Sequence, residues 1–232
     1  MGLLLGLLLV GIERGAREIF PVPLTAALLL AVLAAVTRGL HLDGFMDVCD
    51  GLLGGYTAER RLEIMRDSHV GAFAVVGAVS LIILKYGALV SLLSLGVAGK
   101  EWVLLLFPTL SRWSMVVQLG LFPYVRRQGL GSPLHQGTAR LATGIAAATS
   151  ISASVLLGGI GGSALLAGAT ALAWLLGLGM SRMLGGLTGD TYGATNEIVE
   201  VVGLMAALAL LPPGWIEPLW QWSGIAGFKF LS

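Results

Sequence analysis

Long apolar segments are the feature of this sequence that most limits how it can fold. The segments near 22–37, 70–98, 102–122, 140–158, 163–181 and 196–211 are each apolar enough for a helix in a lipid bilayer. Only 12% of the residues are charged and 56% are hydrophobic, whereas soluble domains carry roughly 25% charged residues. The sequence therefore predicts an all-α, polytopic integral membrane protein, a bundle of about six to seven transmembrane helices.

The two ends of the chain are expected to differ from these spans. Residues 1–12 are apolar, but as a helix they would reach only ~18 Å across a hydrocarbon core of ~30 Å, so we expect a partial helix or a truncated start within 1–21. A signal peptide is the rival interpretation, but no basic region precedes the apolar run. Residues 212–232 contain Trp215, Trp220 and Trp222 and predict an interfacial tail. Without a linker between the spans, 1–232 is expected to be a single membrane-embedded domain.

Charge and cysteine content narrow the function. The formal net charge is +1 and no Lys/Arg-rich run occurs, so we expect no nucleic-acid partner. The single cysteine, Cys49, is interpreted as a packing residue. Lys85 interrupts the segment 70–98, but each half would be too short to cross a bilayer, so we predict one crossing, with Lys85 reaching toward an interface.

A single crossing at 70–98 places the predicted loops 38–69, 123–139 and 182–195 on one face of the membrane. That face is richer in basic residues, which predicts by the positive-inside rule that it is cytoplasmic. It would hold Arg38, Arg60, Arg61, Arg66, Arg126, Arg127, Arg140 and Arg182, against Arg14, Arg17, Lys100 and Lys229 on the other face.

An acidic motif lies in 39–71. Asp43, Asp47 and Asp50 recur at helical spacing, so their carboxylates would form one self-repelling stripe that a divalent cation could neutralise. A second charged run follows at 59–67, with Arg60, Glu63 and Asp67 on one helical face. The structural alternative is a solvated loop with helix caps. His41, beside the stripe, is either a ligand-binding or an ordinary hydrogen-bonding residue.

A glycine-rich stretch at 185–197 leads into the last predicted helix. Its backbone N–H groups and the hydroxyl groups of Thr188 and Thr191 could donate to a phosphate, although no Gly-Lys-Ser/Thr sequence of a Walker A loop is present. Asp190 and Glu197 would share a face if the helix begins at Asp190. The alternative is a turn that simply caps a helix. Arg112, in the middle of a predicted span, predicts either an anion contact or an ion pair with an aspartate.

These motifs resemble those of the cobalamin synthase family, the adenosylcobinamide-GDP ribazoletransferases. The stretch 39–71 is similar to the family pattern His-Leu-Asp-Gly-x-x-Asp-x-x-Asp-Gly followed by Arg-Arg-Leu-x-Ile-Met-x-Asp-Ser-x-x-Gly. Similarity also extends to 110–113, 122–124 and 186–200. A Phe-Leu-Thr-Arg-like element that family members usually carry near the start is absent here.

The resemblance implies a Mg²⁺-dependent enzyme of late coenzyme B12 assembly, in a prokaryotic inner membrane, that joins adenosylcobinamide-GDP to α-ribazole or its 5′-phosphate and releases GMP. Its catalytic and metal-binding residues would be Asp43, Asp47, Asp50 and Asp67, and which aspartate is the base stays open. Substrate contacts are expected from His41, Arg60, Arg61, Arg112, Thr188, Asp190, Asn196 and Glu197. The expected partners are these substrates and the lipid bilayer, and self-association into a homo-oligomer stays open.

Two other functions compete with this one. A membrane enzyme that transfers a phosphoalcohol from a nucleotide to a lipid would use a similar Asp-x-x-Asp-Gly motif, but its Ala-Arg pair after that glycine is missing here. A cation-coupled transporter would also place carboxylates in a helical bundle, although at mid-membrane and along a path.

Overall fold

The computed structural model describes residues 1–95, 99–125, 139–211 and 215–219, and within them the chain is helical. Its helices are α1 (Gly2–Arg17), α2 (Val22–Val36), α3 (Leu40–Gly54), α4 (Ala58–Ile64), α5 (Ala72–Ser94), α6 (Lys100–Leu121), α7 (Ala139–Leu184) and α8 (Gly189–Leu210). One isolated bridge, between Tyr124 and Leu187, joins two connecting segments. The prediction of an all-α fold is confirmed.

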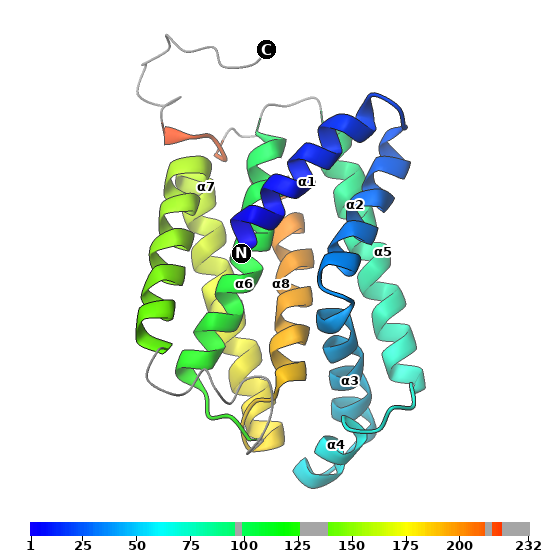
Figure 1. Cartoon of the computed structure of the whole chain (residues 1–232). Coiled ribbons are helices and arrows are strands. Elements are labelled where there is room, and N and C mark those ends of the chain that lie inside the picture. Colours follow the sequence, from blue (N-terminus) through cyan, green and yellow to red (C-terminus); the bar gives the residue numbers. More distant parts are fainter. Residues whose placement is uncertain (96–98, 126–138, 212–214, 220–232) are drawn as a thin grey trace.

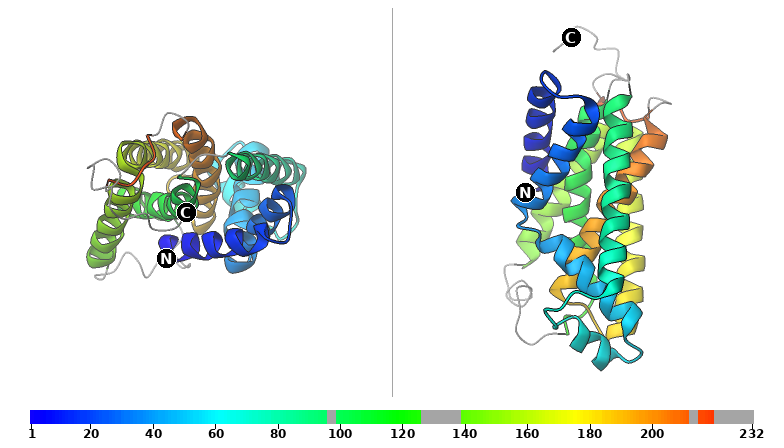
Figure 2. Two further views of the ribbon diagram at one scale, coloured as in Figure 1. Left: turned by 90° about the horizontal axis from the view of Figure 1, so that it is seen from above. Right: turned by 90° about the vertical axis from the view of Figure 1, so that its right-hand side faces the viewer.

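The helices form one elongated bundle (Figures 1 and 2). α5, α6, α7 and α8 run along its length, whereas α1 and α2 occupy the upper half and α3 and α4 the lower half of Figure 1. The connections from α3 to α5, and from α7 to α8, lie at the lower end, where α6 also ends. The single crossing predicted for 70–98 is therefore correct, and the described parts of the connections after residue 54 lie at the same end, as expected.

Buried leucines and close glycine contacts hold the upper half together. Leu89 and Leu92 of α5, Leu104 of α6 and Leu204 of α8 are inaccessible and share one core cluster. A Cβ placed on Gly2 would lie 2.5 Å from the Cα of Thr109, so α1 approaches the backbone of α6 directly. Small residues permit such contacts in membrane bundles, where packing rather than water exclusion drives helix association.

The long helix α7 is a helical hairpin rather than one rod. Gly159 has φ 55° and ψ −136°, a conformation that favours glycine, and it divides the helix into two limbs (Figure 1). A Cβ on Gly162 would lie only 2.2 Å from the carbonyl oxygen of Ser154, which shows that the limbs fold back on each other. The turn predicted between the segments 140–158 and 163–181 is therefore present.

Among the described residues, four helices are long and apolar enough to cross a membrane, or five if α2 and α3 form one span bent by 86°. Those four are α5, α6, α7 and α8, with the hairpin α7 counted once. The number is lower than the predicted six to seven because the predicted spans at 140–158 and 163–181 are the two limbs of α7, and because α1 and α2 are only 16 and 15 residues long. These properties are those of a multi-pass membrane protein.

The largest difference from the sequence prediction concerns 38–69, expected as a connection between spans that carries two short polar helices. Residues 40–54 do form a helix, α3, but it packs between α5 and α8 inside the bundle. The chain turns sharply before it, because Arg38 and Gly39 have φ values of 53° and 70°. Gly44 and Gly51 are buried and let α3 approach its neighbours. The charged side chains lie on only one side of this helix, so the sequence did not show that its other side is buried.

Candidate functional site

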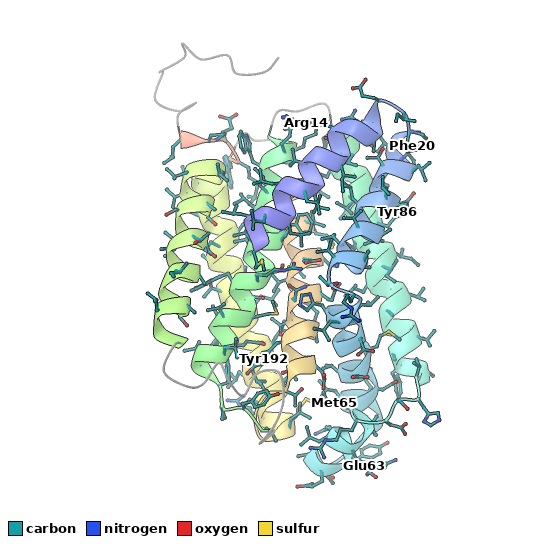
Figure 3. All side chains as sticks on the ribbon, in the orientation of Figure 1. Arg14, Phe20, Glu63, Met65, Tyr86 and Tyr192 are labelled. Atoms are coloured by element: carbon teal, nitrogen blue, oxygen red, sulfur yellow. The ribbon has the colours of Figure 1, made fainter. Side chains whose placement is uncertain are left out.

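The two polar motifs meet where α3 crosses the first turns of α8. A Cβ on Gly44 would lie 2.9 Å from the Cα of Asp190, and one on Gly193 would lie 3.1 Å from the carbonyl oxygen of His41. The backbones are therefore in direct contact, and substitution at either glycine would separate them. Figure 3 shows Tyr192, from this part of α8, near the lower end of the bundle, on the same side as Glu63 and Met65.

A capping box fixes the start of α8. The Thr188 hydroxyl oxygen accepts the N–H of Thr191, and the Thr191 hydroxyl accepts the N–H of Thr188. The turn before it is tied to the end of α6, since Leu187 N–H donates to the Pro123 carbonyl at 2.8 Å. The helix begins at Gly189, so Asp190 and Glu197 lie on one helix as predicted. The expected structural alternative for Thr188, a helix cap, is what the geometry shows.

The three aspartates of the acidic stripe on α3 have two different environments. Both carboxylate oxygens of Asp50 accept backbone N–H groups at the start of α5, from Gly71 at 2.6 Å and Ala74 at 2.9 Å. Asp50 thus anchors α5 to α3. Asp43 is exposed and Asp47 is half-buried, one turn apart on the same helix. These two carboxylates are the part of the stripe best placed to meet a ligand.

Asp67 lies away from the stripe, in the exposed connection after α4. Its carboxylate accepts the backbone N–H of His69 at 3.0 Å and contacts His69 Nδ1 at 2.6 Å. The side-chain hydrogen bond from His69 is the main cause that lowers the pKa of Asp67. The same bond raises the pKa of His69. Both groups are fully exposed, so this pair shapes a surface turn.

The two arginines of α4 have different environments. Arg60 is exposed and pairs with Glu63 at 2.6 Å, an arrangement that leaves it open to exchange partners. Arg61 donates from Nε to the Gly55 carbonyl at 3.0 Å and from Nη1 to the Met183 carbonyl at 3.2 Å. Arg61 therefore ties α4 to the end of α7. Of the two, Arg60 is the one whose guanidinium is available to a phosphate.

The four predicted metal ligands are not gathered into one set. Within the described residues, no group of three or more His, Cys, Asp or Glu side chains is arranged to hold a metal ion. Mg²⁺ is commonly held by only one or two protein carboxylates, with substrate phosphates and water completing its octahedron. Asp43 and Asp47 fit that smaller requirement, whereas Asp50 and Asp67 are engaged by backbone N–H groups.

A buried ionic network lies in the middle of the bundle. Lys85 of α5 is 2% exposed, and its Nζ lies 2.5 Å from Glu197 Oε2 and 2.7 Å from Glu200 Oε2, both on α8. Arg112 of α6 pairs with the other oxygen of Glu200. Two cations thus balance two carboxylates, which offsets much of the cost of burying them.

Neutral side chains complete this network. Ser111 Oγ donates to Glu200 Oε1 at 3.3 Å, and Asn196 Nδ2 donates to the same oxygen at 3.2 Å. The Arg112 ion pair predicted from sequence is present, but its partner is Glu200 rather than an aspartate. The network therefore gives Arg112 and Glu197 ion-pair partners within the protein, which the sequence did not predict for Glu197.

Lys85 and Glu200 are the residues that sequence reasoning missed. Lys85 was expected to reach toward an interface, but it is buried and paired with α8, so that expectation is wrong. The sequence did contain a signal for this pairing. Lys85, Glu197 and Glu200 lie in apolar segments, where charged groups usually pair with each other. What the sequence does not reveal is that α5 and α8 are neighbours.

Two polar atoms next to this network have no partner within the described residues. They are His41 Nδ1 and Asn196 Oδ1, both buried. Buried polar atoms are rarely left without a hydrogen bond, so each is a candidate contact for a ligand. His41 also lies within electrostatic range of Arg112, Glu200 and Lys85. The site thus extends from the Asp43 and Asp47 carboxylates toward the ionic network.

A cavity of about 260 Å³ adjoins the network. Its walls come from α2, α3 and α5 and are mostly apolar, while the ionic residues form its polar side. It is lined by Ala27, Leu30, Ala31, Leu33, Ala34, Thr37, Leu42, Leu81 and Ile82, together with Lys85, Arg112, Glu197 and Glu200.

The amino-acid sequence is similar to a known protein family and to several named proteins. The family model described as cobalamin-5-phosphate synthase matches residues 1–208. A protein of Desulfitobacterium hafniense named adenosylcobinamide-GDP ribazoletransferase is 42% identical over 199 residues, covering 84% of this chain and 77% of that protein. No solved structure matches the chain.

Two further similar proteins carry the same name. The one from Geotalea daltonii is 39% identical over 211 residues, covering 90% of this chain and 83% of its own length. The one from Pseudomonas entomophila is 42% identical over 216 residues, covering 91% and 85%. The family-model match over residues 1–208 spans the segments that carry the acidic motif of α3, the ionic network and the start of α8.

Proposed function

Because the chain belongs to the cobalamin-5-phosphate synthase family, we infer that it is an adenosylcobinamide-GDP ribazoletransferase, an enzyme of cobalamin biosynthesis, as its relatives are named. In this reaction a hydroxyl group of α-ribazole, or of its 5′-phosphate, attacks the phosphorus attached to cobinamide. A new P–O bond forms, the bond to the bridging oxygen breaks, and GMP leaves with that oxygen. The product is adenosylcobalamin or its 5′-phosphate.

The contact between Gly44 of α3 and Asp190 of α8 is the observation that supports a single reaction site most directly. It holds the acidic stripe next to the start of α8, although the two motifs are far apart in sequence. Substitution of a phosphate ester needs an aligned nucleophile, a proton acceptor and stabilisation of the leaving charge. We assign proton removal from the attacking hydroxyl to a carboxylate of the Asp43–Asp47 pair.

Asp43 and Asp47 would also hold Mg²⁺, and when bound this ion neutralises charge on the pyrophosphate. The exposed guanidinium of Arg60 is suited to a phosphate contact from outside the bundle, since its ion pair with Glu63 lies at the surface and contributes little. Asn196 Oδ1 and His41 Nδ1, which are buried and have no partner in the described part of the chain, are offered to the substrate hydroxyl groups. Asp50, Arg61 and Thr188 would support the site by fixing α5, α4 and α8.

We propose that the end of the bundle carrying α4 faces the cytoplasm of a prokaryotic inner membrane. The basis is the larger number of arginines in the sequence segments assigned to that face, together with the location of nucleotide substrates inside the cell. Its partners would be adenosylcobinamide-GDP, α-ribazole or its phosphate, and the surrounding lipid.

A product assay tests this function. Purified protein, reconstituted with Mg²⁺, adenosylcobinamide-GDP and α-ribazole 5′-phosphate, should release GMP and form a corrinoid that carries the nucleotide loop. The Asp190→Ala variant keeps the backbone contact with Gly44 but removes a carboxylate from the first turn of α8, next to the acidic stripe, so it should lose rate even at saturating substrate. Folded protein that forms neither product, but moves solute across sealed vesicles, would reject the enzyme in favour of a transporter.

A further inference from the structure

The cavity beside the ionic network has no part in the reaction described above. It lies above the acidic stripe, where the break between α2 and α3 separates the two helices. Ala31 and Ala34, which line it, are exposed, so it opens at the surface of α2. Its inner side reaches Arg112 and Glu197.

The charges of the cavity favour an uncharged occupant. Lys85 and Arg112 are balanced by Glu197 and Glu200, so the polar side attracts neither an anion nor a cation strongly. Arg112 donates to Ser111 Oγ and to Glu200 Oε1 through Nη1. Its remaining N–H groups can therefore donate to a neutral acceptor such as a ring nitrogen.

The volume of the cavity can be compared with the size of each chemical group in the proposed substrates. A cavity of roughly 150 Å³ holds benzene, so about 260 Å³ accommodates a larger planar ring system. A corrinoid macrocycle is far too large, and the guanosine diphosphate group is charged and highly polar. The adenine of the adenosyl group is planar, but it carries a polar exocyclic amine and is attached to the corrinoid. The heteroaromatic base of α-ribazole matches the mostly apolar lining best, because it combines a planar apolar body with an uncharged ring nitrogen.

We propose that this cavity, between α2, α3 and α5, binds the heteroaromatic base of the acceptor nucleoside and selects it by size. The inference rests on the proposed function, since it takes α-ribazole as the acceptor. Leu42 lines the cavity and Asp43 follows it directly on α3. We place the ribose of a base bound against Leu42 along α3, on the way from the cavity to the carboxylates of the acidic stripe.

The test compares two phenylalanine substitutions on α2. Ala34→Phe fills the cavity, whereas Ala35→Phe adds the same side chain at an exposed position that does not line it. Ala34→Phe should raise the KM for α-ribazole by about tenfold or more, the scale on which apolar pockets discriminate size. The KM for adenosylcobinamide-GDP should stay unchanged, and Ala35→Phe should behave as wild type.

A second variant tests the same proposal if Ala34→Phe does not fold. Ile82→Ala removes a partly exposed side chain from the cavity wall and enlarges the space. It should shift selectivity toward an α-ribazole analogue with a bulkier base, measured as the ratio of the two kcat/KM values. Direct binding of α-ribazole to the detergent-solubilised protein, followed by the fluorescence of its base, should weaken in Ala34→Phe without any turnover.

Two results would overturn the assignment. One is an active wild-type enzyme whose acceptor KM is unchanged by Ala34→Phe and whose base selectivity is unchanged by Ile82→Ala. The other is a phospholipid retained by the wild type and lost from Ala34→Phe, with unaltered acceptor binding, which would assign the cavity to an acyl chain. Failure of the wild type to release GMP at all would instead reject the proposed function.

Discussion

Gly44 of α3 and Asp190 of α8 are in backbone contact, with space for a hydrogen atom but not for a methyl group. A Cβ on Gly44 would lie 2.9 Å from both the Cα and the carbonyl oxygen of Asp190. This single contact determines how far the acidic stripe lies from the start of α8, and through it the alignment of the proposed site.

Gly44→Ala is therefore expected to separate α3 from α8 and lower kcat by about a hundredfold, the effect of a displacement near 1 Å in a reaction site. The matched control is Gly203→Ala on α8, where a new Cβ meets no atom within 4 Å. That variant should retain activity. Equal kcat values for Gly44→Ala and wild type, measured by GMP release, would show that the contact does not align the site.

Asp47→Asn and Asp50→Asn should have different effects, although both aspartates belong to one stripe. Asp47→Asn is expected to lower kcat by about a hundredfold or more and to raise the Mg²⁺ concentration needed, because a carboxylate near the pyrophosphate is lost. Asp50→Asn should mainly lower the melting temperature, since Asp50 holds the start of α5. Turnover that is independent of Mg²⁺, or a fully active Asp47→Asn protein, would contradict the metal assignment.

Lys85→Met is expected to destabilise the bundle by about 3–5 kcal/mol, the usual effect of leaving a buried counter-charge without its partner. Within the described residues, Glu197 would then lose its ion-pair partner, whereas Glu200 would keep Arg112. The double variant Lys85→Met/Glu197→Gln restores charge balance and should recover much of the loss. Thermal unfolding in one detergent compares the variants, and equal losses in the single and double variants would count against charge balance as the cause.

The Asp67–His69 pair predicts a local dependence on pH. Because the pKa of His69 is raised, its contribution to the stability of the folded state is fully present below pH 6.5. That contribution is lost as the pH rises through the raised pKa. Because the pKa of Asp67 is lowered, its contribution to the stability of the folded state is fully present above pH 3.8. That contribution is lost as the pH falls through the lowered pKa. Asp67→Asn should therefore lower the pKa of His69, as measured by NMR titration of the ring. An unchanged titration would show that the pair does not form in solution.

The proposed orientation can be tested with single cysteines in a Cys49→Ser background. Glu59 lies in α4 at the lower end of the bundle, and Glu18 lies in the α1–α2 turn at the opposite end (Figure 1). A cysteine at Glu18 should react with an impermeant thiol reagent added outside intact cells, whereas one at Glu59 should react only after lysis. The reverse pattern would invert the orientation. Ser132, on the same predicted face as Glu59, falls outside the described residues.

The spans from α5 to α8 were predictable because apolar length and breaking glycines are local properties of the sequence. Gly159 marks the α7 turn, and Gly189 begins α8 where the Gly-rich stretch ends. The position of α3 was not predictable in the same way. Its acidic stripe conceals a buried face formed by Gly44, Val48 and Gly51, which is visible only once α8 packs against it.

The sequence indicated which residues belong to the candidate site better than it indicated what each of them contacts. Sequence spacing placed Asp43, Asp47 and Asp50 on one stripe, but it could not show that Asp50 bonds to α5. Likewise, Arg60 and Arg61 are equivalent in sequence, yet only Arg61 binds carbonyl groups of neighbouring segments. Such distinctions depend on which segments are neighbours, and in this chain those neighbours are distant in sequence.

The ion pairs of Lys85 have a consequence for how the protein enters the membrane. α5 leaves the ribosome well before α8, so Lys85 reaches the bilayer while Glu197 and Glu200 have not yet been synthesised. A lysine at the centre of a helix adds about 2.5–3.5 kcal/mol to the cost of insertion, which the other apolar residues of α5 must offset. Nascent chains that stop before α8 therefore contain an unneutralised lysine, and the ion pairs of the bundle can form only after α8 has been translated.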